Sequence, residues 1–192
     1  MLINDDFEVA EPVAKVWEFF GDIPRVAACL PGATLTENLG DDKYGGQVVV
    51  RMGPVKLQFA GTAEVAERDE AAKRVVVNAA GADQRGRGQA SMVVTATLSQ
   101  AGQGTKVAVS QDLQLSGAAA QYGRGMIADV TAVLMRDFSA NMAKQIAAAD
   151  RGETAVASAS APAGGLAIGI RAALMALRRV YRRFFLPYQA AS

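Results

Sequence analysis

The sequence predicts an α+β fold in which a curved antiparallel sheet of about seven strands surrounds one long C-terminal helix. Seven short runs with the apolar alternation of strands precede residue 116, and the last six follow one another through short turns. Short links join antiparallel neighbours, so these strands should form a meander. From residue 117 to about residue 149 the chain continues without proline, with apolar residues at helical spacing.

The predicted elements follow in a simple order. The strands are expected at residues 2–9, 33–39, 44–52, 55–66, 74–80, 88–98 and 106–115. Two short helices should separate the first two strands, because Pro12 stands where a helix can begin and Pro31-Gly32 is a turn signal. The long helix presents one apolar stripe, formed by Met126, Ile127, Val130, Val133, Leu134 and Phe138. The strands supply the broad apolar surface that such a stripe needs.

Two polar residues interrupt the inward-facing apolar pattern. Gln111 lies between Val109 and Leu113 on the last strand, and Asp137 follows Val133 by four residues on the helix. A buried polar group without a partner is costly, so two interpretations are open. Either Gln111 bonds the strand backbone and Asp137 lies at a solvated rim, or both orient a ligand inside a mostly apolar cavity.

The second interpretation defines a candidate ligand cavity between the sheet and the long helix. Its wall would combine inward-facing residues of the strands, one stripe of the helix and the turn after the second short helix. The predicted lining residues are Leu30, Val48, Val50, Met52, Phe59, Val77, Met92, Val94, Val109, Gln111, Leu113, Met126, Val130, Leu134 and Asp137.

Composition excludes several kinds of chemistry. The chain has no histidine, which excludes Ser-His-Asp and Cys-His arrangements and removes the commonest metal ligand. Cys29 is the only cysteine, so neither an intramolecular disulfide nor a metal-binding cysteine pair is expected. We predict no catalytic residue and no metal site. The acidic start, MLINDDFEVAEP, is unlike a secretory signal, so a cytoplasmic location is expected.

Charge is divided unevenly along the chain. Residues 1–150 hold 14 Lys and Arg against 18 Asp and Glu, whereas residues 151–192 hold six Arg and one Glu. A stretch of Gly, Ala and Ser separates the two parts. The predicted division is therefore a globular domain at residues 1–149, a flexible linker at 150–165 and a cationic amphipathic helix at 166–188.

The predicted tail helix has an arginine face opposite an apolar and aromatic face. The membrane-binding residues would be Arg171, Leu174, Leu177, Arg178, Arg179, Tyr181, Arg182, Arg183, Phe184 and Phe185. This pattern fits a helix that lies on a membrane surface, or one that docks in a groove of another protein. Four arginines between positions 178 and 183 exclude a transmembrane helix, and the acidic body fits nucleic acid poorly.

Several segments resemble a known family. They are FEVAEPVAKVWEFFGDIPRVAACLPGA, the Gly53-Pro54 hairpin with the strand after it, and GRGMIADVTAVLMRDFSANM. These segments resemble the CoxG family of carbon monoxide dehydrogenase subunits, which belongs to the START and polyketide-cyclase (SRPBCC) superfamily with its helix-grip fold. The resemblance covers about residues 2–148, and the Cys29-Leu30-Pro31-Gly32 segment is its most specific part.

The resemblance implies a non-catalytic companion of a molybdenum-containing carbon monoxide dehydrogenase or a related molybdenum hydroxylase. Such a protein would lie on the cytoplasmic side of the cell membrane as a peripheral protein. It would recruit the enzyme there and carry a quinone in its cavity, with no covalent cofactor. Two alternatives share the fold. One is a small polyketide cyclase or dehydratase-like enzyme, with Asp137, Tyr122 and Tyr44 as candidate acids and bases, and the other is a ligand-free scaffold.

Overall fold

The computed structural model describes residues 1–151. The predicted globular domain at residues 1–149 lies within this part of the chain. Most of the predicted linker at 150–165, and the whole predicted tail helix at 166–188 with its membrane-binding residues, lie outside the described residues.

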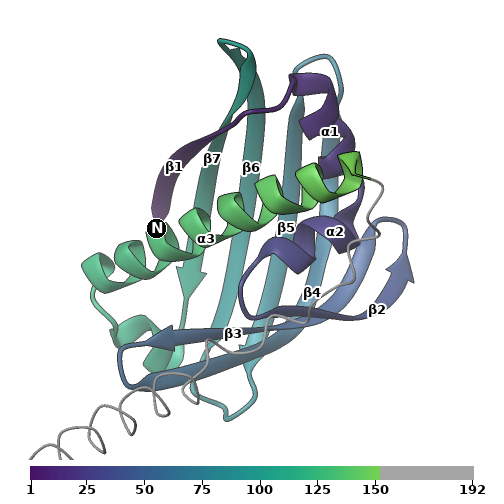
Figure 1. Ribbon diagram of the computed structural model, residues 1–192. Helices are drawn as coiled ribbons and strands as arrows, with labels where there is room; N and C mark the ends of the chain where they lie inside the picture. The colour runs from purple at the N-terminus through teal and green to yellow at the C-terminus, as the bar shows by residue number, and fades with distance from the viewer. Residues whose placement is uncertain (152–192) are drawn as a thin grey trace, which may run out of the picture. The chain divides into compact units, whose positions relative to one another are not determined.

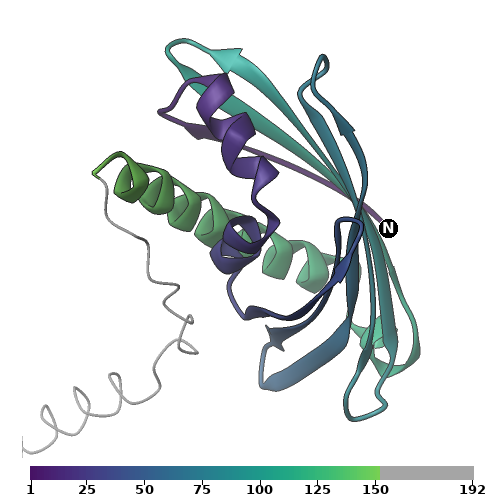
Figure 2. The same cartoon turned by 90° about the vertical axis from the view of Figure 1, so that its right-hand side faces the viewer.

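One seven-stranded antiparallel sheet forms the body, in the order β1-β7-β6-β5-β4-β3-β2. The strands are β1 Leu2–Val9, β2 Ala33–Gly40, β3 Lys43–Met52, β4 Val55–Asp69, β5 Arg74–Asp83, β6 Gln89–Ala101 and β7 Gly104–Leu115. Strands β2 to β7 pair in sequence order, and β1 completes the sheet at the free edge of β7. The sheet curves strongly, and the three α-helices of residues 1–151 lie on its concave side (Figures 1 and 2).

The helices occupy the concave face in two groups. The short helices α1 (Val13–Gly21) and α2 (Ile23–Cys29) follow β1, and the long helix α3 (Arg124–Asp150) crosses the sheet (Figure 1). The predicted α+β fold, a sheet gripping a long C-terminal helix, is confirmed. No helix among residues 1–151 is both long and apolar enough to cross a membrane.

The predicted start of the long helix at residue 117 is wrong. Residues Gly117–Gln121 form a short 3-10 helix, and α3 begins only at Arg124. Gly117 has a φ of +67°, a backbone conformation outside the right-handed helix, and Tyr122 is extended. The backbone therefore leaves the α-helical conformation at two positions before Arg124, first at Gly117 and then at Tyr122.

A closed core occupies one end of the concave face. It consists of Val9, Val16, Phe19, Phe20, Cys29, Ala96, Leu98, Val107, Val109, Phe138, Met142 and Ile146. These residues come from α1, α2, three strands and the C-terminal half of α3. Asn141 Nδ2 donates a hydrogen bond of 3.0 Å to the carbonyl oxygen of Cys29, which fixes α2 against α3. The packing is therefore continuous from the helices to the sheet.

A second, smaller cluster lies at the other end of the face. It consists of Met52, Leu57, Phe59, Ala119 and Ile127. Many apolar residues around it are only partly buried, including Val48, Val50, Leu113 and Val130. We call this part of the molecule the cavity end, because the apolar side chains here do not fill the space between helix and sheet.

Candidate ligand cavity

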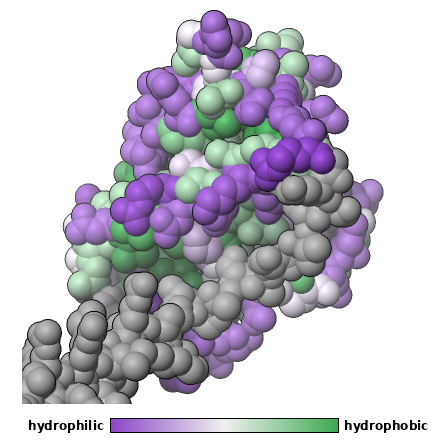
Figure 3. Space-filling model, viewed as in Figure 1, coloured by the Kyte–Doolittle hydropathy of each residue, from purple (hydrophilic) through white to green (hydrophobic). Residues whose placement is uncertain are grey.

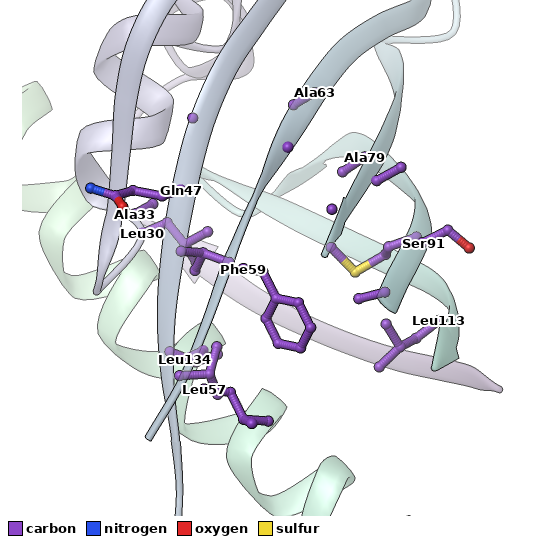
Figure 4. A pocket seen from close by; sticks show the side chains of 18 of the residues that line it. Leu30, Ala33, Gln47, Leu57, Phe59, Ala63, Ala79, Ser91, Leu113 and Leu134 are labelled. Atoms are coloured by element: carbon purple, nitrogen blue, oxygen red, sulfur yellow. The ribbon is translucent and has the colours of Figure 1, made fainter. Parts of the chain in front are cut away.

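A cavity of about 350 Å³ lies between the sheet and the N-terminal half of α3. Its wall comes mainly from β3, β4, β5, β6, β7 and α3, with α2 at one side. Phe59 stands near its centre, with Leu57 and Leu134 on one side and Leu113 on the other (Figure 4). On the face seen in Figure 1, hydrophobic surface gathers beneath α3 and recedes into a hollow (Figure 3).

The cavity exists because the sheet offers very small residues at this level. Four residues without a side chain, or with only a methyl group, lie in register across neighbouring strands: Gly46 on β3, Gly61 on β4, Gly81 on β5 and Ala90 on β6. All four line the cavity. Gly61 is also required by the backbone, since a Cβ there would collide with the carbonyl oxygen of Ala80 on β5. The floor of the cavity is therefore built from backbone.

The structure brings ten of the fifteen predicted lining residues to this cavity. They are Leu30, Val48, Val50, Met52, Phe59, Met92, Gln111, Leu113, Val130 and Leu134. Their placement follows from strand alternation and from the helical stripe, because the cavity lies where the two inward faces meet. The set of lining residues predicted from the sequence did not include the small residues of the cavity floor. A run of Gly and Ala at inward positions of successive strands was the signal that would have found them.

Three predicted strand residues lie away from the cavity wall. Val109 is buried in the closed core, and Val94 packs against that core. Val77 is paired with Val94 across β5 and β6 and is likewise absent from the wall. All three face inward as predicted. The correction concerns position along the strand, because one inward face serves both the closed core and the cavity.

Two predicted helix residues also lie outside the cavity. Met126 is 44% exposed, and the Asp137 side chain is 47% exposed and lies 3.3 Å from the Arg136 guanidinium. At 100° per residue, both project from a flank of α3 about 90° away from the buried Ile127. The predicted stripe was therefore too wide, and Asp137 is a surface residue at the side of the helix.

Gln111 is the polar residue that the structure does place in the cavity. It is 7% exposed, and its Nε2 atom has no hydrogen-bond partner among the described residues. Two other polar side chains of the wall are hydrogen-bonded within the protein. Thr131 Oγ1 donates to the carbonyl oxygen of Ile127 at 2.9 Å, and Gln47 Oε1 accepts from Gln58 Nε2 at 3.0 Å. Within the described chain, no charged residue lines the cavity.

An ion pair between the buried Asp83 carboxylate and the partly exposed Arg87 fixes the loop between β5 and β6 at the cavity end. The Asp83 carboxylate accepts hydrogen bonds from the Arg87 guanidinium and from the backbone N–H groups of Gln58, Arg85 and Arg87. These donors hold the pKa of Asp83 well below its usual range. Arg87 also donates to the carbonyl oxygen of Lys56 at 2.7 Å, which ties the loop to the β3–β4 hairpin. Neither Asp83 nor Arg87 lines the cavity, so this network holds the loop in place beside it.

The side chains at the cavity offer little for acid–base chemistry. Of the three candidate acids and bases, Tyr44 lines the cavity, Tyr122 packs beside the cavity-end cluster and Asp137 lies outside. Burial raises the pKa of the Cys29 thiol to about 11, so this residue is a neutral packing group. Among residues 1–151, no three potential ligands group together for a metal ion.

The fold and this cavity together define the class of protein. A curved sheet that holds a long helix above an apolar cavity is the helix-grip arrangement of the START and polyketide-cyclase superfamily. The family model for the CoxG subunit of carbon monoxide dehydrogenase matches residues 6–147. The chain belongs to this family, as its sequence resemblance indicated, and is a CoxG-type protein.

Solved structures share the fold. A conserved protein from Geobacillus kaustophilus is 23% identical with a TM-score of 0.68, covering 77% of this chain and 95% of that one. The Zhui aromatase/cyclase from Streptomyces sp. R1128 is 14% identical with a TM-score of 0.57, covering 81% and 98%. Ara h 8.0201 is 15% identical with a TM-score of 0.52, covering 77% and 98%. At these identities the likeness concerns the fold. A search of curated proteins found no match to the chain.

Proposed function

We propose that the chain is a non-catalytic accessory protein of a molybdenum-containing carbon monoxide dehydrogenase or of a related molybdenum hydroxylase, and that its cavity carries a quinone. The observation that carries the proposal is the apolar cavity itself. Its volume of about 350 Å³ is within the range of ligand sites, about 300–1,000 Å³. Its uncharged wall suits a neutral hydrophobic molecule, which would bind without a covalent cofactor.

The proposal includes a place of action. The family name connects the chain with carbon monoxide dehydrogenase, whose electrons a quinone could accept. Quinones reside in membranes, and the sequence of residues 166–188 fits an amphipathic helix on an anionic surface. The protein would act on the cytoplasmic side of the cell membrane, as a peripheral protein that recruits the enzyme to the bilayer.

Ligand content is the direct test of the carrier function. The full chain is purified from a quinone-producing host and analysed by native mass spectrometry and organic extraction. The expected result is about one quinone per chain. An Ala90→Phe variant, whose ring would occupy the cavity beside Gly81 and Leu115, is the matched control and should carry none. A wild-type chain that stays empty after incubation with quinone-containing vesicles would contradict the proposal and favour a scaffold.

Membrane attachment is tested separately. Replacing Arg178, Arg179, Arg182 and Arg183 by Gln removes four positive charges from the tail. Each arginine near an anionic leaflet contributes about 1 kcal/mol, so the variant should no longer sediment with phosphatidylserine-containing vesicles. Unchanged sedimentation would argue against the arginine face as the anchor, and quinone binding by the variant shows that the body is intact.

A further inference from the structure

Gln111 is surrounded by apolar side chains on the inward face of β7. Its cross-strand neighbours are Val94 on β6 and Ile3 on β1, and Val109 and Leu113 flank it on the same face of its own strand. None of these four can accept a hydrogen bond with its side chain. Among residues 1–151 the Gln111 Nε2 group is therefore a buried donor without a partner, which folded proteins seldom retain.

The position of this donor matters because it lies at the wall of the cavity. An amide that loses its water on folding and gains no partner carries the full desolvation penalty. The four neighbouring side chains supply no acceptor, so the acceptor has to come from the cavity itself, as an oxygen atom of a bound molecule or of water. The donor is also neutral, and the described wall of the cavity has no positive charge to compensate an anion.

We propose that the Gln111 amide donates a hydrogen bond to an oxygen atom of the bound molecule, and that it selects neutral, largely apolar ligands with a carbonyl-type oxygen. This inference rests on the proposed function, that the cavity binds a hydrophobic molecule. A hydrocarbon of the same shape would leave the amide unpaired, and a fatty-acid anion would bury an uncompensated charge. Both are therefore selected against.

Two probes of the same ring skeleton isolate the effect of the carbonyl oxygens. They are 2-methyl-1,4-naphthoquinone, which has two carbonyl groups, and 2-methylnaphthalene, which has none. Their dissociation constants for the full chain are measured by equilibrium dialysis, and the preference is the ratio of the two constants. Comparing this ratio between wild type and variant cancels the different solubilities of the probes in water.

Gln111→Met removes the amide at nearly constant volume. The preference for the naphthoquinone should fall by about fivefold to tenfold, the factor expected for one neutral hydrogen bond. Gln114→Met is the matched control, since Gln114 lies three residues further along β7 on the exposed side. This control should leave the preference unchanged.

A purely structural role for Gln111 predicts a different result. Removing an unpaired donor should leave the melting temperature of Gln111→Met unchanged or raise it, whereas loss of an internal hydrogen bond would lower it. A lower melting temperature for both Gln111→Met and Gln111→Leu, with an unchanged preference, overturns the inference. An unchanged preference with both probes bound overturns it while the proposed carrier function stands. Failure of the wild-type chain to bind either probe overturns both.

Discussion

The two halves of α3 lie over the same sheet but pack against it differently. In the C-terminal half, Phe138, Met142 and Ile146 are all buried in the closed core. In the N-terminal half, Ile127 is buried, but Val130 and Leu134 are only partly covered and line the cavity. The helix has inward apolar residues along its whole length, so the helix is not the cause of this difference.

The cause lies in what faces each half. Large side chains of α1, α2 and the strands, such as Phe19 and Leu98, fill the space under the C-terminal half. Under the N-terminal half the sheet contributes Gly61, Gly81 and Ala90. The difference separates two parts of one fold: the closed core is filled with side chains and supplies stability, whereas the cavity end keeps an open space, which we propose holds a ligand.

The largest expected effect is on the closed core. Met142 is fully buried, so Met142→Ala should lower the free energy of unfolding by about 3 kcal/mol through lost burial and the cavity left behind. Met126→Ala is the matched control, because it removes the same atoms from an exposed position of the same helix. That change should cost less than about 0.5 kcal/mol. Urea unfolding of both variants gives the comparison, and equal effects would contradict the burial of Met142 in the closed core.

The second prediction adds volume instead of removing it. Ala96 and Ala90 lie on the same face of β6, the first in the closed core and the second at the cavity. Ala96→Phe should destabilise the protein by about 1–3 kcal/mol or more through overpacking. Ala90→Phe should change stability by less than about 1 kcal/mol, because its ring enters existing space, and should abolish ligand binding. If the two variants lose stability equally, the space at Ala90 is not an open cavity.

The smallest expected effect concerns the β5–β6 loop beside the cavity, which the Asp83–Arg87 ion pair holds. Because the folded-state pKa of Asp83 is lowered, its stabilising contribution is present above the unfolded value near pH 4 and is lost as the pH falls through the folded-state pKa. Asp83→Asn should therefore be less stable than wild type at pH 7, and the difference should narrow at pH 3. Urea unfolding at the two pH values measures this, with exposed Asp129→Asn as control. A difference that is independent of pH would contradict the assigned role of the carboxylate.

Much of the fold could be predicted from the sequence because it depends on local patterns. Alternation placed the strands within a few residues of their observed bounds, and short turns determined their antiparallel order. The start of α3 could not be predicted from apolar spacing. It depends on the positive φ of Gly117 and on the extended Tyr122, which spacing does not record.

The cavity could be predicted only in part. Periodicity identifies an inward face, as at Val94, Val109 and Gln111, but does not say whether neighbouring elements fill the space above it. That depends on three-dimensional packing of α1 and α2 against one end of the sheet. Periodicity also placed Asp137 on the inward stripe, although its side chain lies on the flank of the helix. A rotation of a few tens of degrees about the helix axis is enough to move a side chain from the cavity wall to the surface.

Hydrogen exchange tests the central claim, that the cavity end is a ligand site and the closed core is not. Amide exchange is followed by mass spectrometry in the full chain with and without 2-methyl-1,4-naphthoquinone. We expect slower exchange in peptides that cover residues 127–134 and 57–63, which line the cavity. We expect little change in peptides that cover residues 138–146, which belong to the closed core. No ligand-dependent change, or equal slowing in both halves of α3, would contradict the claim.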